Sequence, residues 1–154
     1  MRARIGLIFM AFALGACRGR APYEGKSARE LQSMLHKPDP IVQAQGAYGL
    51  SLLGPEARDA VPDLVEALKA PGPLVRQNAA LALARLGPAA QDAVPALIEA
   101  LHDPEWAVRR QSATALGEIG PAAQTAVSTL EETARDSDSL VRNAALAALK
   151  KLRS

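Results

Sequence analysis

Apolar residues recur along the chain with the spacing of a helix face, and the pattern returns after a fixed interval. The two clearest stripes, both in the order i, i+3, i+4, i+7, are Val61, Leu64, Val65, Leu68 and Val94, Leu97, Ile98, Leu101. The stripes begin 33 residues apart, and one more such step leads to Val127. This pattern predicts amphipathic helices that belong to a repeated unit.

A second apolar stripe follows each of these, and two of its five positions always hold Gly, Ala or Ser. Along the chain it reads Val42, Gly46, Gly49, Leu50, Leu53; Val75, Ala79, Ala82, Leu83, Leu86; Val108, Ser112, Ala115, Leu116, Ile119; and Val141, Ala145, Ala148, Leu149, Leu152. Small residues at these positions let neighbouring helices approach closely. A Gly-Pro pair follows at Gly54, Gly87 and Gly120, where a left-handed Gly is expected to end the helix.

The period predicts four units of two helices each, at residues 28–60, 61–93, 94–126 and 127–154. No helix would exceed about fifteen residues, so none should be stable alone in water. Each apolar stripe must then be covered by the next unit, as in a solenoid. At the position of Val65 and Ile98 the outer units carry Gln32 and Glu131, which predicts end layers that lack a covering neighbour there.

Start signals accompany the first helices. The segment "SARE", Ser27–Glu30, has the pattern of a capping box. Asp59, Asp92 and Thr125 precede the other first helices and are expected to be their N-caps.

These features together resemble the HEAT repeat, in the short bacterial form also found in phycobilisome-lyase-like proteins. The stretch "PLVRQNAALALARLGPAAQDAVPALIEALHDP" carries the Val-Arg pair, the Ala-rich second helix and the Gly-Pro turn. The resemblance covers residues 28–154. It implies an all-α, right-handed α-solenoid of about four two-helix repeats that acts as a binding scaffold.

The first residues have the composition of an export signal. A ten-residue apolar run, Ile5–Leu14, follows Arg2 and Arg4 and is too short to span a bilayer. "LGAC", Leu14–Cys17, resembles a bacterial lipoprotein signal that is cut before the lipid-bearing Cys. We therefore expect a signal peptide at residues 1–16, lipidation at Cys17 and a flexible tether at residues 17–27. An ordinary signal peptide or a membrane anchor with an incidental Cys is the alternative.

Composition and charge narrow the range of functions. Aromatic residues make up only 3% of the chain, and its one Cys excludes an internal disulfide framework. Removal of residues 1–16 leaves 16 basic against 16 acidic residues, so the basic footprint of a nucleic-acid binder is missing. Arg18 directly after Cys17, by the lipoprotein resemblance, favours the outer membrane facing the periplasm in a Gram-negative cell.

Two sets of polar residues recur with the repeat. Arg76, Arg109 and Arg142 could form a structural ladder with the loop acids Asp103 and Asp136, or a cationic stripe for a partner's carboxylates. Gln43 replaces the Arg in the first unit, so a ladder is expected only in the C-terminal half. A polar column is the second set, and its members are Gln45, Asn78, Arg110 and Gln111.

We expect this column on the second helices, which line the concave face in HEAT-like solenoids, to bind a protein partner. Trp106 lies at the start of a second helix, either as an interface anchor or folded back over the loop.

Signs of chemistry are weak. His36 and His102 share a repeat position with Lys69 and Arg135, which suits a cation in the last helical turn rather than a metal ligand. No nucleophile–base–acid set and no Gly-rich phosphate loop occur, so no cofactor, metal or catalytic residue is predicted. The sequence predicts a non-enzymatic scaffold or adaptor, lipid-anchored in the envelope. The alternatives are a structural or regulatory subunit of an envelope complex, or a HEAT-like lyase-type enzyme.

Overall fold

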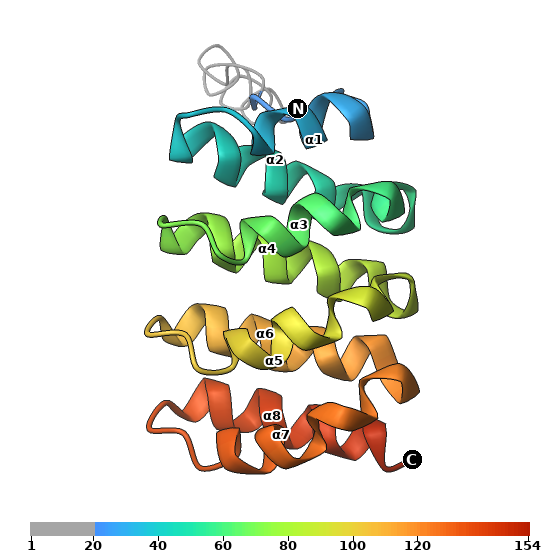
Figure 1. The fold of residues 1–154 in the computed structure, drawn as a ribbon, viewed down its shortest axis with the longest axis vertical. Helices are drawn as coiled ribbons and strands as arrows, with labels where there is room; N and C mark the ends of the chain where they lie inside the picture. Colours follow the sequence, from blue (N-terminus) through green and yellow to red (C-terminus); the bar gives the residue numbers. More distant parts are fainter. Residues whose placement is uncertain (1–20) are drawn as a thin grey trace, which may run out of the picture.

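The structure is a computed structural model that describes residues 21–154. This part of the chain forms four stacked layers, each with a first and a second α-helix (Figure 1). The first helices are α1 (Ala28–Leu35), α3 (Val61–Ala67), α5 (Val94–Ala100) and α7 (Val127–Thr133). The second helices are α2 (Pro40–Leu53), α4 (Pro73–Leu86), α6 (Trp106–Ile119) and α8 (Ser139–Leu152). The predicted class, an all-α solenoid of two-helix repeats, is confirmed.

Three short 3-10 helices connect the layers, and the sequence pattern did not predict them. They are η1 (Gly54–Ala60), η2 (Gly87–Ala93) and η3 (Gly120–Ala126), each of which runs directly into the next first helix. The N–H of Val61, for example, donates to the carbonyl of Arg58 in η1. The carbonyls of the preceding turn thus accept from the first N–H groups, and α3, α5 and α7 begin without a side-chain cap.

The expected N-caps Asp59, Asp92 and Thr125 are therefore wrong. No 3-10 helix lies between Ala21 and α1, and this helix has the cap that the sequence predicts. The Ser27 N–H donates to the Glu30 carboxylate at 2.8 Å, and the Ser27 hydroxyl accepts from the Glu30 N–H, which completes the predicted capping box.

The Gly-Pro junctions turn the chain from one layer into the next. Gly54, Gly87 and Gly120 have φ of 55°, 56° and 76°, as expected for a Gly that ends a helix. Their ψ values, between −129° and −142°, differ from the left-handed helical region and lie near the mirror image of extended backbone. A side chain is strained there, so these junctions require Gly.

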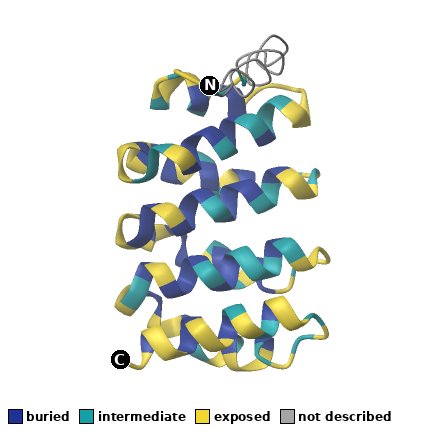
Figure 2. Cartoon of the chain, turned by 180° about the vertical axis from the view of Figure 1, so that it is seen from behind, coloured by how far each residue is buried: buried dark blue, intermediate teal, exposed yellow. Residues whose placement is uncertain are grey.

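The core runs continuously through the layers. Each second helix packs on the next, α2 on α4, α4 on α6 and α6 on α8, whereas the first helices pack mainly on their own second helix and on the η segments. The fully buried large residues come from every layer and include Leu31, Leu50, Leu64, Leu83, Leu97, Leu116 and Leu130. Figure 2 shows the buried residues along the middle of the stacked helices. No short helix could bury this much apolar surface alone.

The two end layers differ in how they are covered. Gln32 is half-buried and its side-chain amide donates to Asp63 of the second layer, so its expected role at an uncovered end is wrong. The reason is direction: this helix position faces the following layer, which exists for α1. In the last layer Glu131 is exposed and pairs with Arg153, as an end position should.

Part of the predicted tether contacts the fold. The rings of Tyr23 and Tyr48 lie 5.1 Å apart in an edge-to-face arrangement, and Tyr23 packs against the buried core of the first layer. Residues 21–27 are thus partly held on the solenoid. The predicted signal peptide, the first residues of the tether and Cys17 lie outside the described residues.

Gly117 of α6 lies against α8 where the two helices approach closely. A Cβ added at Gly117 would lie 2.9 Å from the Cα of Ala148 in α8. Gly117→Ala should lower the free energy of unfolding by about 1–3 kcal/mol, because the overpacking cost exceeds the helix-propensity gain. Urea denaturation measures the change. A variant as stable as the parent would mean that the two helices separate at no cost.

Candidate partner-binding face

Two arginines of the second helices form bidentate ion pairs with the loop of the following layer. Arg76 donates through Nε and Nη2 to Asp103 at 2.7 and 2.9 Å, and Arg109 donates to Asp136 at the same distances. The four side chains are mostly buried. Within the described residues these pairs join the second, third and fourth layers, so the ladder begins one layer before the C-terminal half in which it was expected. They link α4 to the third layer and α6 to the fourth.

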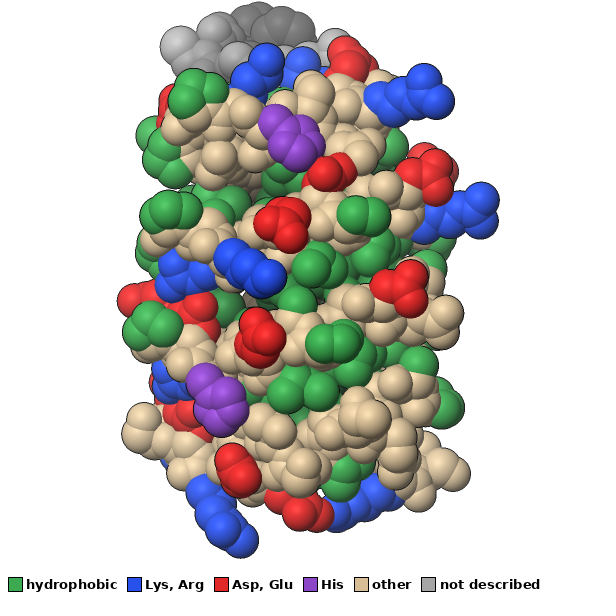
Figure 3. Space-filling model, viewed as in Figure 1, with side chains coloured by type: hydrophobic (Ala, Val, Ile, Leu, Met, Phe, Trp, Pro, Cys, Tyr) green, Lys and Arg blue, Asp and Glu red, His purple; other side chains and the backbone are tan. Residues whose placement is uncertain are grey.

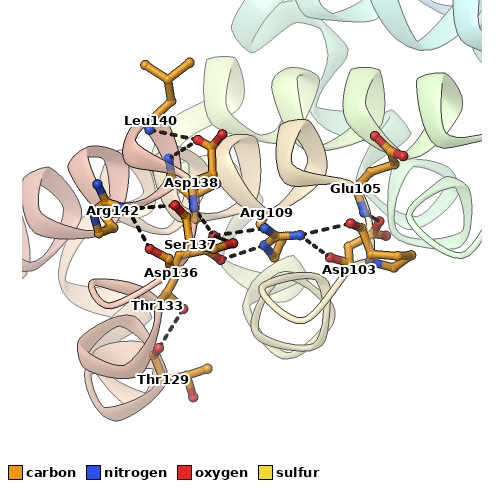
Figure 4. Close-up of polar contacts among 12 residues, drawn as sticks. Asp103, Glu105, Arg109, Thr129, Thr133, Asp136, Ser137, Asp138, Leu140 and Arg142 are labelled. Carbon is orange, nitrogen blue, oxygen red and sulfur yellow. Dashed lines mark hydrogen bonds and ion pairs between the residues drawn. The ribbon is translucent and has the colours of Figure 1, made fainter.

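Each of these arginines also holds its own loop. Nη1 of Arg76 donates to the carbonyls of Ala70 and Pro71, both at 2.9 Å, and Nη1 of Arg109 donates to those of Asp103 and Pro104. Figure 4 shows Arg109 between the two loops. The hydrogen bonds between the Arg109 guanidinium and the Asp136 carboxylate lower the pKa of Asp136 below its ordinary value and raise the pKa of Arg109. Both groups are therefore charged at neutral pH, and the ladder is a structural device.

The predicted polar column does not act as one surface. Asn78 is buried, and its side-chain amide donates to the carbonyl of Ala44 in the preceding layer at 2.9 Å. Its polar group is therefore used between α2 and α4 and is not free for a partner. Gln45 and Gln111 are half-buried on α2 and α6 and remain accessible in part.

Trp106 is partly exposed, and the contact described for its ring is with its own helix rather than with the loop. Its side chain is 41% exposed at the start of α6, and the guanidinium of Arg110 lies 5.4 Å from the ring centroid. This cation–π contact fixes the ring against its own helix while one side stays open to solvent. An aromatic side chain held in this way loses little conformational entropy on binding.

An apolar row that sequence reasoning missed lies at the same ends of the second helices. Ile41, Leu74 and Leu140 share one repeat position and are 65%, 56% and 46% exposed. In the third layer Ala107 takes this position, and the neighbouring Trp106 supplies the exposed apolar group. We call Ile41, Leu74, Trp106 and Leu140 the apolar row. Its signal in the sequence was an apolar residue, spaced by the repeat, that precedes the Val of each second stripe.

The opposite side, built by the first helices, is different (Figure 3). Hydrophobic side chains lie there among acidic and basic ones, and an open groove runs between α3 and η2. Its apolar lining is Val61, Pro62 and Val65, and its charged rim is Arg58, Asp59, Glu66 and Asp92. The rim carries three acidic side chains and one basic one, so its net charge is negative.

The two histidines also belong to the first-helix side. His36 Nε2 lies 3.2 Å from Asp63 of the next layer, and His102 is exposed. Between Ala21 and Ser154 no group of three or more His, Cys, Asp and Glu side chains is placed to hold a metal ion. The helices of this same stretch are all too short or too polar to cross a bilayer.

The geometry agrees with the known proteins that the chain resembles. A family model described as HEAT repeats matches residues 28–91 and 89–150. An engineered protein of known structure is 27% identical, with a TM-score of 0.72 over 82% of this chain. The complex of CpcE and CpcF of phycocyanin lyase from a Nostoc species is 24% identical, with a TM-score of 0.64 over 78% of each chain. A designed armadillo repeat protein in complex with a (KR)4 peptide is 17% identical, with a TM-score of 0.70.

The matches cover only part of the chains of some of these known proteins. The chain spans 62% of the engineered protein and 62% of the designed armadillo protein, which covers 79% of this chain in turn. The two matches below 25% identity show the fold alone. None of the curated proteins matches the chain.

Proposed function

Because the chain belongs to the HEAT-repeat family, we propose that it is a non-enzymatic scaffold or adaptor that binds another protein along its second-helix face. The observation that carries this proposal is the apolar row, which places one exposed apolar group on each of the four layers. Exposed aliphatic and aromatic groups in a regular array are costly in water and are typical of binding surfaces. The solenoid holds them on helices that pack directly on one another, so little ordering is needed on binding.

Solved structures of the same fold give a precedent for a protein partner. One of them is a complex of two chains, and another is a designed repeat protein with a bound peptide. On this chain, Arg110 and Gln111 supply polar groups beside Trp106, while Gln45 does so near Ile41. An apolar centre with a polar rim is the usual anatomy of a specific interface.

A joint Trp106→Ala, Arg110→Ala, Gln111→Ala variant should bind its partner at least about tenfold more weakly, because it removes an aromatic anchor and its rim. Helical content should stay unchanged, since none of the three side chains is buried. The measurement is recovery of co-purified protein from detergent-solubilised membranes, with circular dichroism as the folding check.

Glu66→Ala together with Glu99→Ala is the matched control on the first-helix side, where both residues are exposed. This variant should retain binding. If the control lost the partner and the triple variant kept it, the working surface would be the first-helix side. If the parent chain recovered no partner, the scaffold proposal itself would fail.

We further propose that the protein is exported and anchored at Cys17, on the strength of the apolar run and "LGAC" in the sequence. Cys17→Ser should move the protein from the membrane fraction to the soluble fraction, because stable anchoring requires acyl chains. Cell fractionation and a mobility shift on electrophoresis measure this. Equal membrane association of both proteins, with equal mobility, would contradict lipidation.

A further inference from the structure

We propose that Arg142, at the open end of the arginine ladder, binds a carboxylate of a helical partner protein that packs against α8. The inference rests on the proposed protein-binding role and adds the chemistry of the partner. The site comprises the free edge of the Arg142 guanidinium and the exposed face of α8 beside it.

The guanidinium of Arg142 is already oriented. Its Nη1 donates to the carbonyls of Asp136 and Ser137 at 2.8 and 2.9 Å, as Nη1 of Arg76 and Arg109 does in the other loops (Figure 4). In those two layers, Nε and Nη2 hold the carboxylate of the next layer. Within residues 21–154, Nε and Nη2 of Arg142 have no hydrogen-bond partner. The Nε and Nη2 edge of the guanidinium, which we call the fork, thus binds an acid of the described chain in Arg76 and Arg109 but not in Arg142.

In the first layer a Gln side chain, rather than an Arg, makes the hydrogen bond to the carbonyl of its own loop. Gln43 takes the ladder position in α2, and its side-chain amide donates to the carbonyl of Lys37 at 2.7 Å. The next layer carries Ala70 at the position that Asp103 and Asp136 take later, so no loop acid is available to Gln43 there. Arg therefore stands where the loop of the next layer carries an acid, and Gln stands where that loop carries Ala. By this rule Arg142 is suited to an acid that comes from outside the described chain.

The helix face beside Arg142 is open and carries an exposed leucine, with Lys150 one turn further on. Leu146 is 55% exposed, whereas its equivalents Ala47, Ala80 and Ala113 are fully buried by the following layer. Leu140, six residues earlier, belongs to the apolar row, whose members Ile41 and Leu74 stay exposed beside a following layer. A partner helix on this face would bury Leu146 and bring a loop carboxylate to the guanidinium of Arg142, as α8 and Asp136 do for α6 and Arg109.

A second copy stacked head to tail fits poorly. In the first layer Lys37 takes the position of the loop acids Asp103 and Asp136, so it would face Arg142 with like charge. Tyr23 and Leu31 also cover the outer side of α2 at Gly49, so that end of the solenoid is occupied. The favoured occupant is therefore a different, acid-bearing protein.

The first arm of the test measures whether the fork accepts a carboxylate. The probe is an added layer: the full chain through Leu152, continued by a second copy of residues 120–154. Arg142→Gln and an Asp→Asn change at the copy of Asp136 form a double-mutant cycle by chemical denaturation. We expect a coupling of about tenfold or more in the unfolding equilibrium constant, equal to that of the native Arg109–Asp136 pair. Zero coupling beside a normal native coupling would overturn the proposal.

The second arm seeks the natural partner, with photoreactive benzoylphenylalanine in place of Leu146 in intact cells. We expect one protein adduct whose cross-linked segment contains Asp or Glu, reduced about tenfold or more by Arg142→Gln. Arg153→Gln, the same charge change at the same end of the solenoid, should leave the yield unchanged.

An adduct that ignores Arg142→Gln, an adduct with a second copy only, or no adduct would each overturn the proposal. If the triple variant at Trp106 still loses its partner in that case, the scaffold function stands without this site.

Discussion

Leu116→Ala is expected to lower the free energy of unfolding by about 3–5 kcal/mol. Leu116 is fully buried in α6, which packs on α4 and α8. Neighbours on both sides are fixed by their own layers, so the cavity cannot collapse. Denaturation in urea, followed by circular dichroism, measures the change.

The last layer supplies the controls. Leu149→Ala, the equivalent change in α8, should cost less, because solvent-exposed neighbours such as Leu146 and Lys150 can rearrange toward the cavity. Leu146→Ala should change stability by less than about 0.5 kcal/mol, since the side chain is exposed. Equal losses at Leu116 and Leu149 would show that the layers do not support one another in the way a solenoid requires.

Arg109→Ala is expected to cost about 2–4 kcal/mol at neutral pH, because it leaves the mostly buried Asp136 carboxylate without its bidentate partner. The loss should depend on pH. The Arg109 hydrogen bonds lower the pKa of Asp136 in the folded state, so the unfolded chain takes up a proton first as the pH falls. The contribution of the pair is complete above the unfolded pKa and disappears as the pH falls through the folded pKa.

The measurement is the difference in unfolding free energy between parent and Arg109→Ala at pH 7, 5, 4 and 3. The difference should be constant from pH 7 to 5 and shrink below about pH 4. Arg135→Ala removes the same charge from an exposed site near the same loop and should show neither the loss nor the pH trend. A difference that stayed constant down to pH 3 would mean that Arg109 acts through packing rather than through its charge.

The repeat spacing, the two apolar stripes and the capping box were enough to predict the helices and their stacking. This worked because each stripe contains more apolar surface than one short helix can bury, so a layer of like sequence must cover it. The Val-Arg pair and the loop acids Asp103 and Asp136 also placed the ladder, since their spacing is fixed by the same repeat. Whether an end position faces a neighbour depends on the direction in which the helix presents it, and for Gln32 the sequence pattern did not contain that information.

The tertiary structure decided which side chains of the candidate site are available to a partner. Asn78 and Gln111 occupy the same repeat position, yet Asn78 is buried and donates to the carbonyl of Ala44 between two layers, whereas Gln111 is half-buried. The apolar row and the free edge of Arg142 exist only once the layers are assembled, because exposure and pairing depend on what packs beside each residue. The sequence by itself determined the repeated layer and its contacts with the next one. Only the stacked structure decided which side chains those contacts use up and which remain for a partner.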